Sequence, residues 1–178
     1  MAVSCCSDTS CWAERVGGKG RDVRQPRVVG GRRYGRRHGL SRREREQFLA
    51  EPGIGTLSVV EWPDRAPLTI PIWYDYAPGG ELWVRTGPDS RKARAIRAVG
   101  RFSLMVQRTE PTVRYVSVEG PVSRITADSR DQAVQMAARY LPADRVEDFV
   151  EYEQTQLGEH VTLYMQPEHW VSADLGQG

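Results

Sequence analysis

The sequence predicts one mainly β domain with flanking helices, in which six to seven antiparallel strands form a barrel and the helices pack outside it. From residue 54 onward, short segments rich in β-branched and aromatic residues alternate with turns that contain Gly or Pro. Two helical segments between residues 128 and 156 interrupt this β pattern. Strands interrupted in this way are typical of a barrel with helices on its outer surface.

Residues 1–38 differ in composition from the rest of the chain. They hold nine Lys and Arg against three Asp and Glu, a net charge of +6, so the remaining residues carry −4 of the overall +2. The segment is rich in Gly, Arg and Ser and has no hydrophobic periodicity, which predicts a disordered basic leader. The folded domain is expected at residues 39–178. Its negative charge argues against a nucleic-acid-binding domain, which leaves binding through the leader as a weaker alternative.

The leader also carries all three cysteines, Cys5, Cys6 and Cys11. Their spacing lacks the second ligand pair of a structural zinc site, so no metal is predicted. The paired arginines are followed by polar residues where an export signal needs an apolar stretch. No apolar run is long enough to span a bilayer, and we expect a cytoplasmic protein without a membrane partner.

Most elements can be placed from local signals. Ser41 with Glu44 forms a capping box that opens the first helix, and Pro52-Gly53 ends it. Pro71 lies inside a strand, where it lacks an N–H for a ladder, so it is expected at an edge, a bulge or a place where a ligand replaces a neighbouring strand. The expected strands are 54–60, 68–76, 82–86, 101–107, 113–119, 122–125 and 160–166, and the expected helices are 41–49, 90–99, 128–140 and 144–156.

The stretch Leu82–Arg94 contains the strongest functional signal. It reads as a strand, a Gly-Pro turn and a helix that begins with Ser90 or Asp89 as its N-cap. Arg91 and Lys92, one of only two lysines in the chain, occupy the first helical turn. The unpaired N–H groups and the dipole there favour an anion, which predicts a phosphate site. An ordinary surface helix with cationic residues is the alternative explanation.

The motifs P-I-W-Y-D-Y, W-V-R-T-G-x-x-S-R-K-A-R and R-Y-V-S-V-E-G-P-V occur in this order. They resemble the FMN-binding split-barrel superfamily, which includes pyridoxamine 5'-phosphate oxidases and F420-dependent reductases. The resemblance covers residues 40–175 and implies an oxidoreductase that binds F420 or FMN and passes a hydride to a small conjugated or oxidised acceptor. It also implies a homodimer in which the partner closes each site.

The resemblance assigns roles to eleven residues, although no catalytic side chain is identified. Ile70, Pro71, Ile72 and Trp73 would line the flavin-like ring. Arg85 with Thr86 would meet the ribityl chain. Thr86, Ser90, Arg91 and Lys92 would hold the phosphate, and Tyr115 and Trp170 would reach across the dimer interface.

Two departures from the oxidase pattern argue against vitamin B6 oxidation. Tyr115 stands where those oxidases usually carry glutamine, and the R-L-H-D-R type motif that binds pyridoxal phosphate is missing from the C-terminal part. The P-x-W-Y strand and the T-G-x-x-S-R-K-A-R turn look closer to the deazaflavin reductases, and the pyridoxal-binding end is absent, so F420 is expected as the first choice of cofactor, with FMN close behind. A non-catalytic FMN-binding protein, acting as a store or sensor, is the alternative function. The carboxylates Glu147, Asp148, Glu151 and Glu153 are expected on a solvated helix face.

Overall fold

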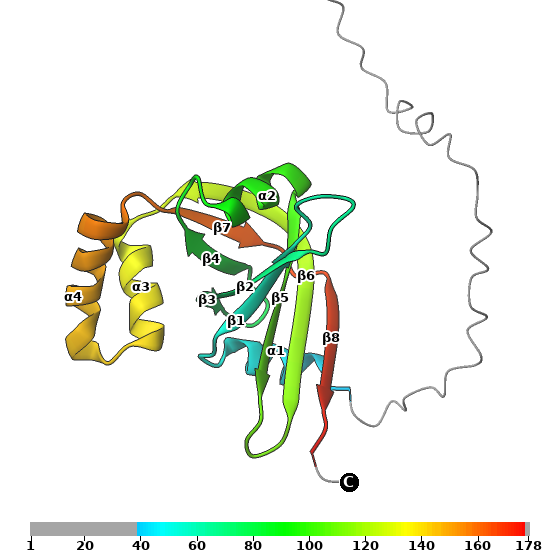
Figure 1. The fold of residues 1–178 in the computed structure, drawn as a ribbon. Helices are drawn as coiled ribbons and strands as arrows, with labels where there is room; N and C mark the ends of the chain where they lie inside the picture. Colours follow the sequence, from blue (N-terminus) through cyan, green and yellow to red (C-terminus); the bar gives the residue numbers. More distant parts are fainter. Residues whose placement is uncertain (1–38, 177–178) are drawn as a thin grey trace, which may run out of the picture. The chain divides into compact units, whose positions relative to one another are not determined.

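The computed structural model describes residues 39–176 (Figure 1). The expected leader, its cysteines and the last two residues lie outside this range. Within it, four α-helices and one short π-helix accompany a single eight-stranded sheet. The strands are β1 (Gly55–Val59), β2 (Leu68–Ile72), β3 (Tyr74–Tyr76), β4 (Leu82–Thr86), β5 (Arg101–Arg108), β6 (Arg114–Ala127), β7 (Val161–Met165) and β8 (His169–Asp174). The helices are α1 (Arg42–Ala50), α2 (Arg91–Val99), α3 (Arg130–Tyr140), α4 (Ala143–Tyr152) and the π-helix η1 (Glu153–Leu157).

The strand order β2-β1-β5-β6-β7-β4-β3 makes an antiparallel barrel with a split. β2 and β3 stand at opposite ends of this order, yet only Trp73 separates them in the chain. The two ends of the sheet must therefore meet at Trp73 without pairing there. The predicted fold class is confirmed, although the expected strand 68–76 is two strands because the chain passes from one end of the sheet to the other at Trp73.

The long strand β6 links the two halves of the barrel. Its first half pairs with β5 and β8, and its second half pairs with β7. A Cβ at Gly120 would lie 1.8 Å from the carbonyl oxygen of Gln166, so no side chain fits where these partners change. The sequence predicted a break at Gly120-Pro121, but the chain stays extended and its register shifts only between Val122 and Arg124.

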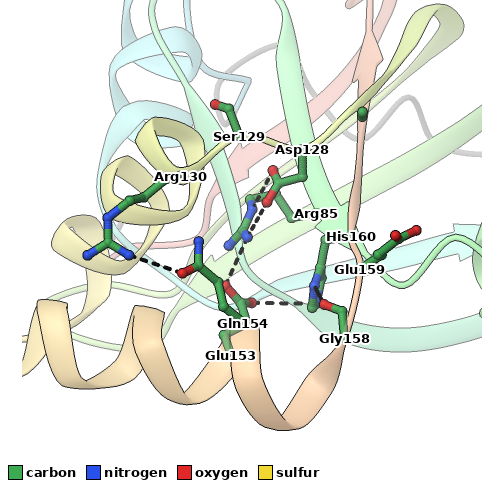
Figure 2. A pocket seen from close by; sticks show the side chains of 10 residues that line it. Arg85, Asp128, Ser129, Arg130, Glu153, Gln154, Gly158, Glu159 and His160 are labelled. Atoms are coloured by element: carbon green, nitrogen blue, oxygen red, sulfur yellow. Dashed lines mark hydrogen bonds and ion pairs between the residues drawn. The ribbon is translucent and has the colours of Figure 1, made fainter.

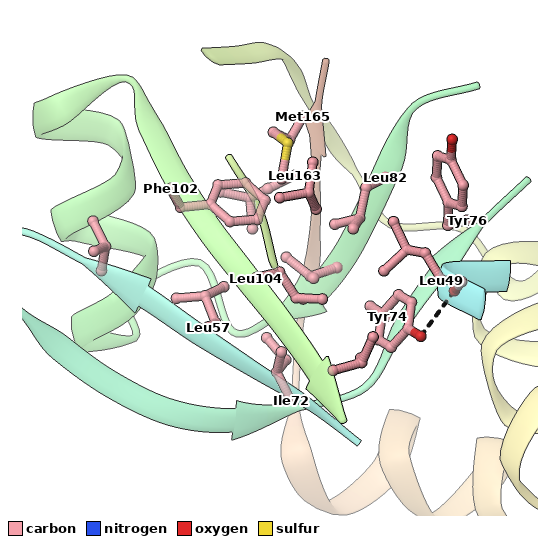
Figure 3. Packing of buried hydrophobic residues seen from close by; sticks show 14 of the residues in the cluster. Leu49, Leu57, Ile72, Tyr74, Tyr76, Leu82, Phe102, Leu104, Leu163 and Met165 are labelled. Carbon is pink, nitrogen blue, oxygen red and sulfur yellow. Dashed lines mark hydrogen bonds between the residues drawn. The ribbon is translucent and has the colours of Figure 1, made fainter. Parts of the chain in front are cut away.

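Alternating apolar side chains of the strands fill the barrel, and α1 and α2 contribute to the same core (Figure 3). Tyr74 is fully buried at one end, where its hydroxyl donates to the carbonyl oxygen of Leu49, 2.8 Å away. Each fully buried aliphatic side chain stabilises the fold by about 2 kcal/mol. The largest fully buried residues are Tyr74, Leu49, Leu57, Leu82, Ile96, Leu104, Met136, Leu163 and Met165.

Helix α2 caps the barrel through Ala93, Ala95 and Ile96. Ser90 is its N-cap, and Gly100 ends it with a left-handed φ of 74° that glycine adopts without strain. Val99 follows Ile96 at helical spacing, which predicts a core position. It is 42% exposed, because the last helical residue has already rotated away from the sheet.

Helices α3 and α4 form a hairpin with its own small core of Ala133, Ala137, Val146 and Val150. Asp128 was expected to open α3, but Ser129 caps it in a capping box with Gln132. Asp144 was expected to open α4, which instead begins at Ala143 behind Pro142. β8 lies beyond the last strand expected from the sequence, because its pairing with β6 depends on contacts distant in the chain.

Within residues 39–176, no helix is long and apolar enough to cross a membrane.

Candidate functional site

The turn between β4 and α2 is held in shape by its own side chains. Thr86 is 5% exposed, and its hydroxyl donates to Ser90 Oγ at 3.0 Å. Ser90 Oγ also accepts from the N–H of Ala93 at 3.2 Å. Because Ser90 Oγ accepts two hydrogen bonds within the turn, its own hydroxyl proton remains free to point outward.

Arginines further along α2 bind the carbonyl groups of the same turn. Arg97 donates to the carbonyl oxygen of Pro88 at 2.5 Å, and Arg94 donates to that of Asp89. The N–H groups of Arg91 and Lys92, at the first two helical positions, have no acceptor among residues 39–176. The acceptors of the turn are thus occupied while several donors stay open, which is the arrangement that an anion requires.

Lys92 provides the unmatched charge at this turn. No carboxylate of the described range forms an ion pair with its ammonium group, and partial burial lowers its pKa. Holding a partly desolvated cation without a partner costs free energy, and a bound anion removes that cost. The predicted phosphate residues Thr86, Ser90, Arg91 and Lys92 are therefore brought together in one turn.

Arg91 differs from Lys92 because it already has a carboxylate partner. Its Nε lies 2.7 Å and 2.8 Å from the two oxygens of Glu61, and its Nη2 donates to the same group. Hydrogen bonding to Arg91 lowers the pKa of Glu61, so the carboxylate stays ionised. Glu61 lies in the loop between β1 and β2, and the sequence treated that loop only as a turn. The sequence offered one hint of this ion pair, namely an acidic residue in the turn before the expected strand 68–76.

The predicted ring-lining residues lie along β2 and just beyond it. β2 pairs only with β1, so one side of its backbone stays open, and Pro71 opposite Thr56 fits this outer strand. Ile72 is buried in the barrel core, Ile70 packs against that core from a partly buried position, and Pro71 is exposed on the other face. Residues 70–72 therefore share an open backbone edge, but their side chains do not form one common surface.

Trp73 fills the split between the sheet ends. Its ring stacks on Tyr140 of α3, with centroids 4.7 Å apart, and contacts Phe149 of α4 at 5.3 Å. The Tyr140 hydroxyl accepts from the N–H of Tyr74 at 3.0 Å and lies 2.8 Å from that residue's carbonyl oxygen. Burial raises the pKa of Tyr140, which therefore remains a protonated donor. The helical hairpin thus replaces strand pairing at the point where the barrel is open.

Arg85 precedes Thr86 in β4, and neighbouring strand residues face opposite sides of a sheet. Figure 2 shows its side chain directed toward Asp128 and Glu153. Its side chain is 6% exposed, and its Nε donates to Asp128 at 2.8 Å. Its Nη2 lies 2.8 Å from Glu153, although that contact is not aligned as a hydrogen bond. Burial acts to lower the pKa of Arg85, but the two carboxylates outweigh it and raise the pKa.

Glu153 was expected on a solvated helix face, and this prediction is wrong. It is 8% exposed and lies 3.5 Å from His160 Nε2, where η1 turns it inward. The ion-pair cluster of Arg85, Asp128, Glu153 and His160 lines a pocket of about 480 Å³ (Figure 2). Since Arg85 is matched by two carboxylates within the chain, its predicted contact with the ribityl chain stays a prediction.

The two residues expected at a dimer interface lie in different surroundings. Tyr115 is partly exposed on β6, opposite Ala173 of β8 in the register. Trp170 packs within its own chain, with the guanidinium of Arg45 4.8 Å above its ring and Tyr76 at 6.1 Å. The role of both residues across an interface stays a prediction.

Comparison with known proteins agrees with this geometry. A family model described as pyridoxamine 5'-phosphate oxidase matches residues 41–172. Among solved structures, the conserved hypothetical protein Rv2991 from Mycobacterium tuberculosis is 26% identical with a TM-score of 0.61, covering 78% of this chain and 89% of that one. An F420 reductase is 24% identical with a TM-score of 0.56, covering 71% and 94%. General Stress Protein 26 from Bacillus anthracis str. Sterne is 17% identical with a TM-score of 0.51, covering 73% and 92%.

A search of curated proteins gives no match at the same level of significance. The family model nevertheless spans the barrel from the N-cap of α1 into β8, and so includes the turn between β4 and α2 and the open strand β2. The chain therefore belongs to the pyridoxamine 5'-phosphate oxidase family and has its split-barrel fold.

Proposed function

We propose that the protein is an oxidoreductase that binds F420 or FMN and transfers a hydride to a small conjugated or oxidised acceptor. The observation that carries this proposal is the turn at the start of α2, where, among residues 39–176, Lys92 has no carboxylate partner and two backbone N–H groups have no acceptor. Family membership supports a flavin-type cofactor, and the F420 reductase among the solved structures has this fold. F420 is our first choice and FMN our second.

The residues of the turn fit the phosphate of either cofactor. The outward hydroxyl of Ser90, the N–H groups of Arg91 and Lys92 and the ammonium of Lys92 would bind its oxygens. The open edge of β2 at residues 70–72 would run along the ring, with Trp73 at the end of that edge. When bound, the cofactor supplies the redox chemistry. The chain's part is to hold and orient the cofactor, and Tyr115 or solvent would donate the product's proton.

We propose further that the chain works as a homodimer. Val171 of β8 is 61% exposed, and the register places it opposite Ser117, on the same face of the sheet as Tyr115. A partner on this face would cover apolar surface and bring its Tyr115 toward a ring held on an outer strand. Sedimentation should give twice the monomer mass. A monomer that binds the cofactor tightly would contradict this arrangement.

The decisive experiment is to titrate the purified apo-protein with FMN and with F420 while following the quenching of their fluorescence. We expect tight binding of F420, weaker binding of FMN, and oxidation of the reduced complex by a quinone or an enone. Tight FMN binding with none for F420 would reverse the order. Binding without turnover would favour the storage or sensor function, and binding of neither would remove the oxidoreductase proposal.

A further inference from the structure

We propose that Glu61 selects the kind of phosphate that the turn accepts, favouring a singly charged phosphodiester over a doubly charged phosphomonoester. This inference rests on the proposed function, because it concerns the same turn. It adds a specificity-determining residue from the loop between β1 and β2, outside the strand-turn-helix motif.

The geometry of the Glu61–Arg91 pair carries the argument. Both carboxylate oxygens of Glu61 lie within 2.8 Å of Arg91 Nε, and Nη2 binds the same group. The Arg91 side chain is 54% exposed and that of Glu61 only 19%, so the carboxylate reaches in from its loop to the helix start. A phosphate that used Nε or Nη2 of Arg91 would have to displace Glu61 or share these two nitrogens with it.

The charge at the turn follows from this pairing. The two partners cancel, and Lys92 and the helix dipole remain to attract an anion. Arg94 and Arg97, which lie further along the helix, bind carbonyl groups of the turn. Asp89 adds a second acidic side chain to the turn. Glu61 therefore matches the charge of the Arg91 guanidinium, occupies two of its nitrogens and places a fixed negative charge beside the turn.

The two candidate cofactors respond differently to that negative charge. The phosphomonoester of FMN carries about −1.5 to −2 near pH 7 and presents three acceptor oxygens. The phosphodiester of F420 carries one negative charge and presents two. Because Coulomb repulsion is proportional to charge, Glu61 opposes the monoester about twice as strongly as the diester. A diester has fewer phosphate oxygens that need donors, and the free donors of Ser90 and Lys92 suit this smaller number.

The test compares Glu61→Gln with Asp64→Asn, which removes an equal charge from the same loop at an exposed carboxylate with no ion pair among residues 39–176. Dissociation constants for FMN, F420 and riboflavin are measured by fluorescence quenching. In Glu61→Gln we expect the dissociation constant of FMN to fall about fivefold more than that of F420, because the phosphomonoester carries up to one more negative charge for Glu61 to repel. Riboflavin, which has no phosphate, should not change, and Asp64→Asn should leave the ratio unaltered.

Two results would overturn the inference. If Glu61→Gln shifts FMN and F420 equally, or shifts neither, then Glu61 only tethers its loop to α2, while the proposed function still stands. If riboflavin improves as much as FMN, the effect comes from the ring site and Glu61 does not read the phosphate. Failure of the wild-type protein to bind either cofactor is a separate result, and it contradicts the proposed function itself.

Discussion

Two cationic side chains at the end of β4 and the start of α2 illustrate two uses of positive charge. Arg85 is buried in the ion-pair cluster, where Asp128 and Glu153 match it and the helical hairpin meets the sheet. Lys92 stands partly buried at the helix start without a carboxylate partner in the described range. A cation whose charge is satisfied inside the chain serves the fold, whereas one left unsatisfied beside open N–H groups is suited to a ligand.

The largest expected effect comes from Arg85→Ala. Removing the guanidinium leaves two carboxylates close together and poorly solvated, which destabilises a fold by about 3 to 5 kcal/mol. The free energy of unfolding in urea measures this loss. Arg124→Ala removes an exposed guanidinium paired with Glu81 and should be close to neutral.

The Arg85 experiment also tests the predicted ribityl contact. Arg85→Met with Asp128→Leu and Glu153→Leu replaces the charges by apolar groups and should recover much of the lost stability. If this stable variant binds the cofactor normally, Arg85 has only a structural role. Weak binding in a stable variant would support the contact inferred from the family motif.

Lys92→Ala should weaken cofactor binding and leave the stability of the fold nearly unchanged, the reverse of what is expected for Arg85→Ala. The fold should keep its stability within about 0.5 kcal/mol, the usual range for a surface substitution. Cofactor affinity should fall about ten- to a hundredfold, because a charge-assisted hydrogen bond is lost. Fluorescence titration measures the affinity, and Arg43→Ala, an exposed cation of α1 without an ion pair in residues 39–176, is the matched control. Unchanged affinity would show that the phosphate binds elsewhere.

The smallest expected effect is the pH dependence of the Glu61–Arg91 pair. The pKa of Glu61 in the folded protein is lowered from 4.5 by its hydrogen bond to Arg91. The pair therefore contributes stability above pH 4.5 and loses it as the pH falls through the folded pKa. Wild type should therefore be slightly more stable than Glu61→Gln above pH 4.5, and the two should converge in more acidic solution. Urea unfolding at several pH values checks this, and a difference that grows on acidification would contradict it.

Local signals predicted much of the fold and of the phosphate turn. The capping box at Ser41 and the cap at Ser90, one of the two residues proposed for that position, each depend on a few neighbouring residues, and both are present. Phe102, Leu104 and Val106 alternate along the expected strand 101–107, and all three are buried in the core. The break at Trp73 and the strand β8 were missed, because both depend on which distant strand pairs with which.

The surroundings of individual charged residues could not be predicted from the sequence for the same reason. The sequence grouped Glu153 with three solvated carboxylates, since its neighbours on a regular helix would be exposed. The π-helix and the nearby Arg85 turn it inward instead. Glu61 stands 30 residues from Arg91, so no spacing rule connects them.

The family of the chain was recognised from the order of three sequence motifs. By itself, local sequence determined the strand, turn and helix at residues 82–99, the caps of α1 and α2 and the alternating core positions of β5. These follow from backbone hydrogen bonding and from side-chain periodicity, which act over a few residues. Only the tertiary structure decided which charges are matched, because ion pairs form between segments that the barrel brings together. It therefore separated Arg85, which lies with Asp128 and Glu153, from Lys92, which lies beside open donors at the start of α2.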